Sequence, residues 1–113
     1  MIRYLDPLYV TKNTEEKIKK LKFSLRTGAG MTGLYLITIA SGENDVFDIL
    51  PVMLFKQRPF RHRDHDVIGV AEDEQAAFKL VKRIHEEYYA AFQTYTGIRA
   101  ELLKRLSEQE KRS

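Results

Sequence analysis

Apolar residues gather into short runs that predict β-strands. The run at 34–40 is nearly continuous in apolar and β-forming residues, which is typical of a strand at the centre of a sheet. A second run at 46–50 follows a turn-forming segment, so we expect it to lie antiparallel to the first. A third run lies at 67–71. Residues 5–10 predict a short extended stretch or an edge strand, restricted by Pro7.

Two further segments show the spacing of amphipathic helices. The first has a stripe of Ile18, Leu21 and Leu25 with lysines around it, and it ends at Gly28. The second begins in an acidic segment that suits the positive end of a helix, and its apolar stripe comprises Ala77, Leu80, Val81, Ile84 and Tyr88. Between the second and third strands we expect a short helix over 52–55 and a polar loop over 58–66.

These elements predict an α+β fold. A mixed sheet of three or four strands is covered by two long helices, and residues 1–113 form one domain. A helix-mediated crossover between the strands at 46–50 and 67–71 would be right-handed if those strands are parallel neighbours. The buried core is expected to include Leu34, Leu36, Ile37, Ile39, Val67, Ile68 and Val70.

The carboxy-terminal third has a heptad-like pattern. Seven residues are spaced alternately three and four apart, namely Val81, Ile84, Tyr88, Ala91, Tyr95, Ile98 and Leu102. The unbroken phase favours one helix over 74–107, about 50 Å long at 1.5 Å per residue, with 90–113 projecting from the domain. The alternative is two helices with a break at 94–97, the second folded back on the domain.

A projecting helix would expose an apolar stripe, and such stripes usually mark an interface. We therefore predict a homodimer or higher oligomer held by Tyr88, Ala91, Tyr95, Ile98, Leu102 and Leu106.

The net charge of +3 is distributed unevenly. Residues 1–27 carry seven basic and three acidic side chains, and residues 56–65 carry four and one. A fold could gather these segments into one patch. Arg58, Arg61 and Arg63, with the lysine-rich first helix, form a candidate site for a polyanion, since phosphates and stacked bases would suit these residues and Phe60. The alternative is a solvated loop beside an ordinary amphipathic helix.

Two other motifs are weaker. The segment 28–33 matches G-x-G-x-x-G, but it follows a helix and precedes a strand, whereas a dinucleotide site needs the reverse order. The segment 62–66 contains two histidines and two aspartates, but neighbouring arginines oppose a cation and no nucleophile is identifiable. We expect no catalytic residue, no metal and no cofactor.

Composition and hydropathy indicate where in the cell the chain is expected. The chain has no cysteine, its first residues do not read as a signal peptide, and its longest apolar stretch is too short to span a membrane. A cytoplasmic protein without a membrane partner is therefore expected.

The stretch from Leu8 to about Tyr89 resembles a group of small uncharacterised bacterial proteins. The resemblance rests on the Leu-Tyr-Val opening, the strand Leu-Tyr-Leu-Ile-Thr-Ile-Ala-Ser, the Phe-Asp-Ile-Leu segment and Val-Ile-Gly-Val-Ala before a helix. It implies a shared fold and no activity. The leading functional interpretation is a non-enzymatic protein-interaction module that self-associates. A nucleic-acid-binding accessory protein is the alternative, and a small enzyme or metal protein using 62–66 is a third.

Overall fold

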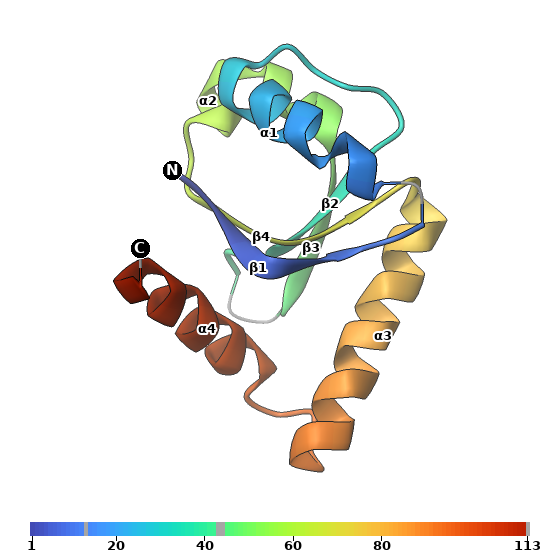
Figure 1. The fold of residues 1–113 in the computed structure, drawn as a ribbon, viewed down its shortest axis with the longest axis vertical. Helices are drawn as coiled ribbons and strands as arrows, with labels where there is room; N and C mark the ends of the chain where they lie inside the picture. Colours follow the sequence, from blue (N-terminus) through green and yellow to red (C-terminus); the bar gives the residue numbers. More distant parts are fainter. Residues whose placement is uncertain (13, 43–44, 113) are drawn as a thin grey trace.

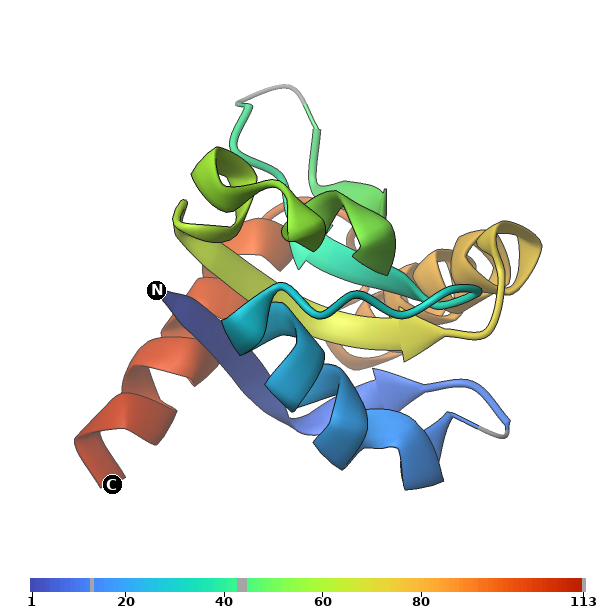
Figure 2. The same cartoon turned by 90° about the horizontal axis from the view of Figure 1, so that it is seen from above.

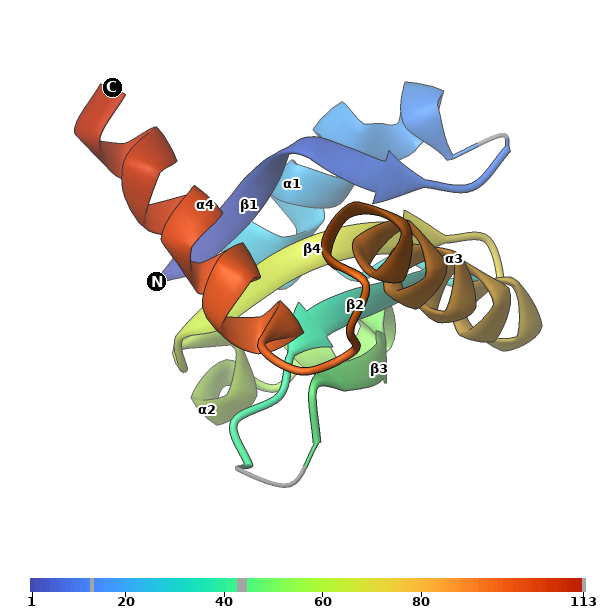
Figure 3. The same ribbon diagram turned by 90° about the horizontal axis from the view of Figure 1, so that it is seen from below.

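The computed structural model describes residues 1–12, 14–42 and 45–112. A four-stranded sheet forms the middle layer, as Figure 1 shows. One face is covered by α1 (Ile18–Thr27), η2 (Val52–Lys56) and α2 (Arg58–Arg61), with η1 (Glu15–Lys17) leading into α1. The other face is covered by α3 (Glu74–Phe92) and α4 (Ile98–Arg112), seen from below in Figure 3. The expected α+β class is confirmed.

The strand order of the sheet is β1-β4-β2-β3. β1 (Ile2–Val10) is an edge strand that runs parallel to β4 (His65–Ala71), and its register shifts between Tyr4 and Tyr9 around Pro7, which has no N–H to donate. β2 (Tyr35–Ile39) lies antiparallel to both β4 and β3 (Phe47–Pro51). β3 and β4 run parallel but are not neighbours, because β2 lies between them, so the condition attached to the crossover is not met.

Side chains on the two faces of the central strands belong to two separate apolar clusters. Leu36 and Val67 pack with α1 and η2, whereas Ile37 and Ile68 pack with α3 and α4. The predicted core residues are buried, except that Ile39 is half-buried. Burial on both faces explains why the β2 and β4 segments are almost continuously apolar.

The predicted single helix over 74–107 is wrong. α3 ends at Phe92, where Gln93 adopts a left-handed conformation with φ of 59°, and Gly97 turns the chain with φ of 83°. The Tyr88 hydroxyl donates to the carbonyl of Thr96 at 2.7 Å and fixes this turn. The alternative of two helices with a break near 94–97 is the one observed, and α4 folds back onto β1.

This turn changes the environment of the predicted interface residues. Ile98, Leu102 and Leu106 are at most 3% exposed and join the cluster that contains Leu5 and Ile68. They follow the same spacing that a coiled coil would use, but the surface that covers them is the sheet of their own chain. Residues 98–112 therefore do not project, and the exposed stripe expected at these three positions is absent.

Polar contacts hold the far end of α4 against the edge strand. The Gln109 side chain accepts from the backbone N–H of Asp6 at 2.8 Å and donates to the carbonyl of Tyr4 at 3.0 Å. Arg3 bonds to Asp66 of β4 at 2.7 Å and to Glu110 at 3.2 Å, so one guanidinium joins β1, β4 and α4. Gln109 thereby satisfies backbone groups on the outer edge of β1.

Replacing Ile37 by Ala should lower the free energy of unfolding by about 2–5 kcal/mol, because this fully buried side chain lies in the central strand and its loss leaves a cavity. Urea denaturation followed by circular dichroism measures the change. Phe78→Ala is the control, since Phe78 is 59% exposed and should shift stability by about 0.5 kcal/mol or less. A loss below about 0.5 kcal/mol for Ile37→Ala would contradict the position of β2 in the core.

Candidate anion-binding face

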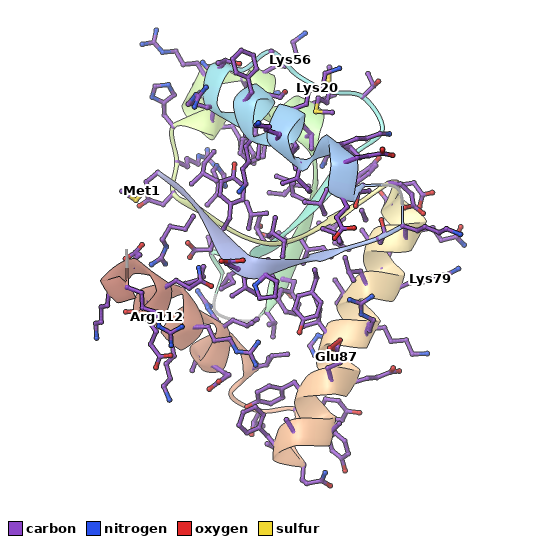
Figure 4. All side chains as sticks on the ribbon, viewed as in Figure 1. Met1, Lys20, Lys56, Lys79, Glu87 and Arg112 are labelled. Carbon is purple, nitrogen blue, oxygen red and sulfur yellow. The ribbon has the colours of Figure 1, made fainter. Side chains whose placement is uncertain are left out.

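Basic side chains are concentrated on the helical layer formed by residues 14–34 and 52–63. This layer holds nine basic and two acidic side chains, whereas residues 72–112, on the other side of the sheet, hold eight of each. In Figure 4, Lys20 and Lys56 lie on the first layer, and Lys79 and Glu87 on α3. We call the basic face the set Lys17, Lys19, Lys20, Lys22, Arg26, Lys56, Arg58, Arg61 and Arg63.

The local sequence explains why exposed basic side chains are concentrated on this layer. α1 contains no acidic residue, and it buries Leu21 and Leu25 against the sheet, so its four cationic side chains remain exposed. In the described part of the chain no ion pair involves any residue of the basic face. On α3 and α4, by contrast, three pairs four residues apart neutralise one another, including Arg83–Glu87 at 3.3 Å. The cations of the basic face are therefore available to an external anion.

One cleft on this face lies between β1, α1 and α2. Its volume is about 480 Å³, and we call it the Tyr4 cleft, lined by Met1, Ile2, Tyr4, Lys22, Leu25, Arg26, Arg61 and His62. Figure 2 shows α1 lying beside β1 from this side of the molecule. The lining combines cations with apolar side chains and contains no carboxylate.

Arg61 is the fixed cation of the Tyr4 cleft. Its Nη1 donates to the backbone carbonyls of Phe55 at 3.0 Å and Lys56 at 3.4 Å, which leaves Nε and Nη2 without a protein acceptor among the described residues. The guanidinium lies against Gly28, where a side chain would overlap it. Gly28 also ends α1 in the left-handed region, with φ of 79°. One glycine therefore both ends the helix and makes room for the cation.

Tyr4 provides a neutral hydroxyl in the same cleft. Burial raises the pKa of Tyr4 to about 12, and the positive charge of Arg26 opposes that shift. The Lys22 Nζ lies 4.7 Å from the centre of the Tyr4 ring, which is within the range of a cation–π contact. At neutral pH the phenol is a hydrogen-bond donor beside three cations.

A second cleft lies on the face around the glycine-rich loop. This glycine-loop cleft has a volume of about 530 Å³ and is lined by Lys17, Lys20, Ala29, Gly30, Met31, Thr32, Leu34, Met53 and Lys56. It also contains no carboxylate. The G-x-G-x-x-G match follows the carboxyl end of α1, so its helix end presents carbonyl groups, and the cations come from side chains instead.

The predicted polyanion residues lie on and beside α2. Arg58 and Arg63 are exposed and Arg61 is half-buried, but 58–66 is not the expected loop, since it contains α2 and the first residues of β4. Phe60 packs against Phe55, with ring centres 5.1 Å apart, and the Arg63 guanidinium lies 5.6 Å from its ring. Phe60 is therefore a packing residue and not an open stacking surface.

Sequence reasoning missed the rest of the Tyr4 cleft. Lys22 and Arg26 are four residues apart, so helical spacing alone places them on one side of α1. Their proximity to Tyr4 and Arg61 depends on the strand order, which brings β1 beside β4. No motif in the sequence signals that order.

The histidine and aspartate residues of 62–66 are separated. The His65 ring is buried between Phe55 and Phe60, and its Nε2 donates to the carbonyl of Phe60 at 2.8 Å. Asp66 binds Arg3, while Asp64 binds the terminal amine of Met1, which lowers the pKa of the Asp64 carboxyl. Within the described ranges, no group of three or more potential ligands is arranged to hold a metal ion.

No family model, curated protein or solved structure matches the chain. The resemblance to small bacterial proteins therefore stays a prediction. Among the helices in the described part of the chain, none has the length and apolar character needed to cross a membrane.

Proposed function

We propose that this chain binds single-stranded nucleic acid through the basic face. The observation that supports this most is the excess of nine basic over two acidic side chains in one layer, together with their lack of ion pairs among the described residues. Neutralising phosphates with lysine and arginine releases condensed counterions, which supplies much of the affinity of such proteins.

Exposed apolar side chains on the same helical layer as the basic face favour a single strand over an acidic protein as the ligand. Phe23 on α1 is 52% exposed and Met53 on η2 is 40% exposed. Unpaired bases stack on aromatic rings such as that of Phe23, and the contribution is about 1–3 kcal/mol for each base. Phe23 is exposed whereas Phe60 is half-buried, so the stacking role suggested by the sequence for Phe60 is assigned to Phe23, whose ring centre lies 5.6 Å from the Arg26 guanidinium. The cytoplasmic location expected from the sequence gives access to such a partner.

Fluorescence anisotropy with a labelled single strand of twenty nucleotides tests the proposal. If about five phosphates are contacted, raising salt from 50 to 200 mM should weaken binding about 100-fold, since the logarithm of affinity falls by about 0.7 per phosphate for each decade of salt. A blunt duplex of the same length should bind more weakly, because its bases cannot reach Phe23. No binding at 50 mM salt would contradict the proposal.

A second proposal is self-association through the corner between α3 and α4. Tyr89, Phe92 and Tyr95 are 41%, 45% and 57% exposed, and the rings of Tyr89 and Tyr95 stack with centres 4.6 Å apart. A second copy of this corner would cover these rings. Light scattering at about 100 µM protein should then give a mass above the 13.2 kDa of one chain, and Tyr95→Ser should lower it. A monomer at that concentration rules the dimer out.

A further inference from the structure

We propose that the Tyr4 cleft binds a terminal phosphate monoester together with the nucleoside attached to it. The inference rests on the proposed function and names where one end of the ligand is held. The same chemistry occurs at the end of a strand and in a free nucleotide.

The charges of the cleft favour a dianion. Lys22, Arg26 and Arg61 face a lining without carboxylates, and His62 lies at the same wall. A backbone phosphodiester carries one negative charge, whereas a terminal phosphate monoester carries about −1.5 to −2 at pH 7. The three cations have no ion-pair partner among the described residues, so they should bind the monoester more tightly than the diester.

Arg61 is suited to orient this group. Its Nη1 is held by two backbone carbonyls, so the guanidinium plane is fixed before a ligand arrives. A fixed fork of N–H donors matches the paired oxygens of a phosphate, and little side-chain entropy is lost on binding. Lys22 and Arg26 are exposed on α1 and can close over the bound group from the other side.

The rest of the cleft suits the nucleoside. Ile2, Leu25 and the Tyr4 ring give an apolar wall, and the neutral Tyr4 hydroxyl can donate to a base or sugar oxygen. A volume of about 480 Å³ lies within the range of about 300–1,000 Å³ that is usual for small-molecule sites. The glycine-loop cleft has cations but no aromatic side chain in its lining, so it does not offer the same wall.

Titration calorimetry and amide-shift mapping test the inference with adenosine 5′-monophosphate, inorganic phosphate and adenosine. We expect the monophosphate to bind, inorganic phosphate to bind more weakly, and adenosine not to bind. The double variant Lys22→Ala/Arg26→Ala should weaken the monophosphate about 10-fold or more, because two cations of the cleft are lost. Lys17→Ala/Lys20→Ala, in the glycine-loop cleft, is the matched control and should lower this affinity by less than about threefold, because only long-range attraction is lost. All four residues are exposed, so both variants should fold.

Ten-nucleotide strands that end in a 5′-phosphate, in a 3′-phosphate or only in hydroxyls show whether the ligand is a strand end or a free nucleotide. A phosphorylated strand that binds at least about 10-fold tighter than the hydroxyl-ended strand identifies a strand end as the ligand, and equal affinities of these strands identify a free nucleotide. No monophosphate binding up to about 10 mM, or equal losses in the two double variants, overturns the inference. If hydroxyl-ended strands still bind with the expected salt dependence, the basic face stands and only the cleft proposal fails.

Discussion

A chain that ends at Gln93 should fail to fold stably at 25 °C. Removing α4 uncovers the cluster around Leu5 and Ile68 and takes away three side chains that are at most 3% exposed. Burial of each such side chain contributes about 1.5–3 kcal/mol, while the whole free energy of unfolding of a small domain is about 5–15 kcal/mol. Circular dichroism and urea denaturation of the shortened chain measure the loss.

A chain that ends at Ser107 is the control for this truncation. It keeps Ile98, Leu102 and Leu106 but loses the contacts of Gln109 and Glu110 with the edge strand. It should fold, with a free energy of unfolding lowered by about 1–3 kcal/mol. If the chain ending at Gln93 instead unfolds at the same urea concentration as the full chain, α4 is not part of the core.

The quadruple variant Lys17→Glu, Lys20→Glu, Lys56→Glu and Arg58→Glu should weaken binding of single-stranded nucleic acid about 100-fold or more. It removes contacts with phosphates and places carboxylates, which repel phosphates, at the same positions. All four side chains are exposed and none forms an ion pair among the described residues, so stability should change little. Anisotropy at 50 mM salt measures the affinity.

The matched control places the same charge change elsewhere. Lys79→Glu, Lys104→Glu, Lys111→Glu and Arg112→Glu alter the net charge equally but lie on α3 and α4, where Figure 4 labels Lys79 and Arg112. The affinity of this variant for the single strand should fall by less than about 10-fold, since only long-range attraction changes. Equal losses in the two variants would mean that net charge, and not the basic face, controls binding.

The fold was predictable where burial dictates residue type over a whole element. A strand covered on both faces is apolar along its whole length, as β2 is. A helix covered on one face has apolar residues three and four positions apart, as α1 does, so each pattern indicates one kind of element. The end of α3 was not predictable in this way. Ile98, Leu102 and Leu106 keep the spacing of a coiled coil whether they face a partner or their own sheet, and the positive φ values of Gln93 and Gly97 separate the two outcomes.

The candidate site was predictable only in part, for a related reason. Charge counting identified Arg58, Arg61 and Arg63 and the lysines of α1 as separate basic segments. That both segments cover the same face follows from strand order, and strand order depends on contacts between β1 and β4, which are some sixty residues apart in the chain. Tyr4 shows no local signal of a binding residue, because its role in the cleft arises from its neighbours.

Amide-shift mapping of the isotope-labelled chain during titration with a single strand tests whether the basic face is the binding surface. We expect the shifts at 50 mM salt to concentrate in residues 14–34 and 52–63, around α1, η2 and α2, and to diminish when salt is raised to 200 mM. Residues 74–92 of α3 should stay unshifted, since this helix lies across the sheet from the basic face. Shifts centred on α3 and α4, or no saturable shifts at 50 mM salt, would contradict binding through the basic face.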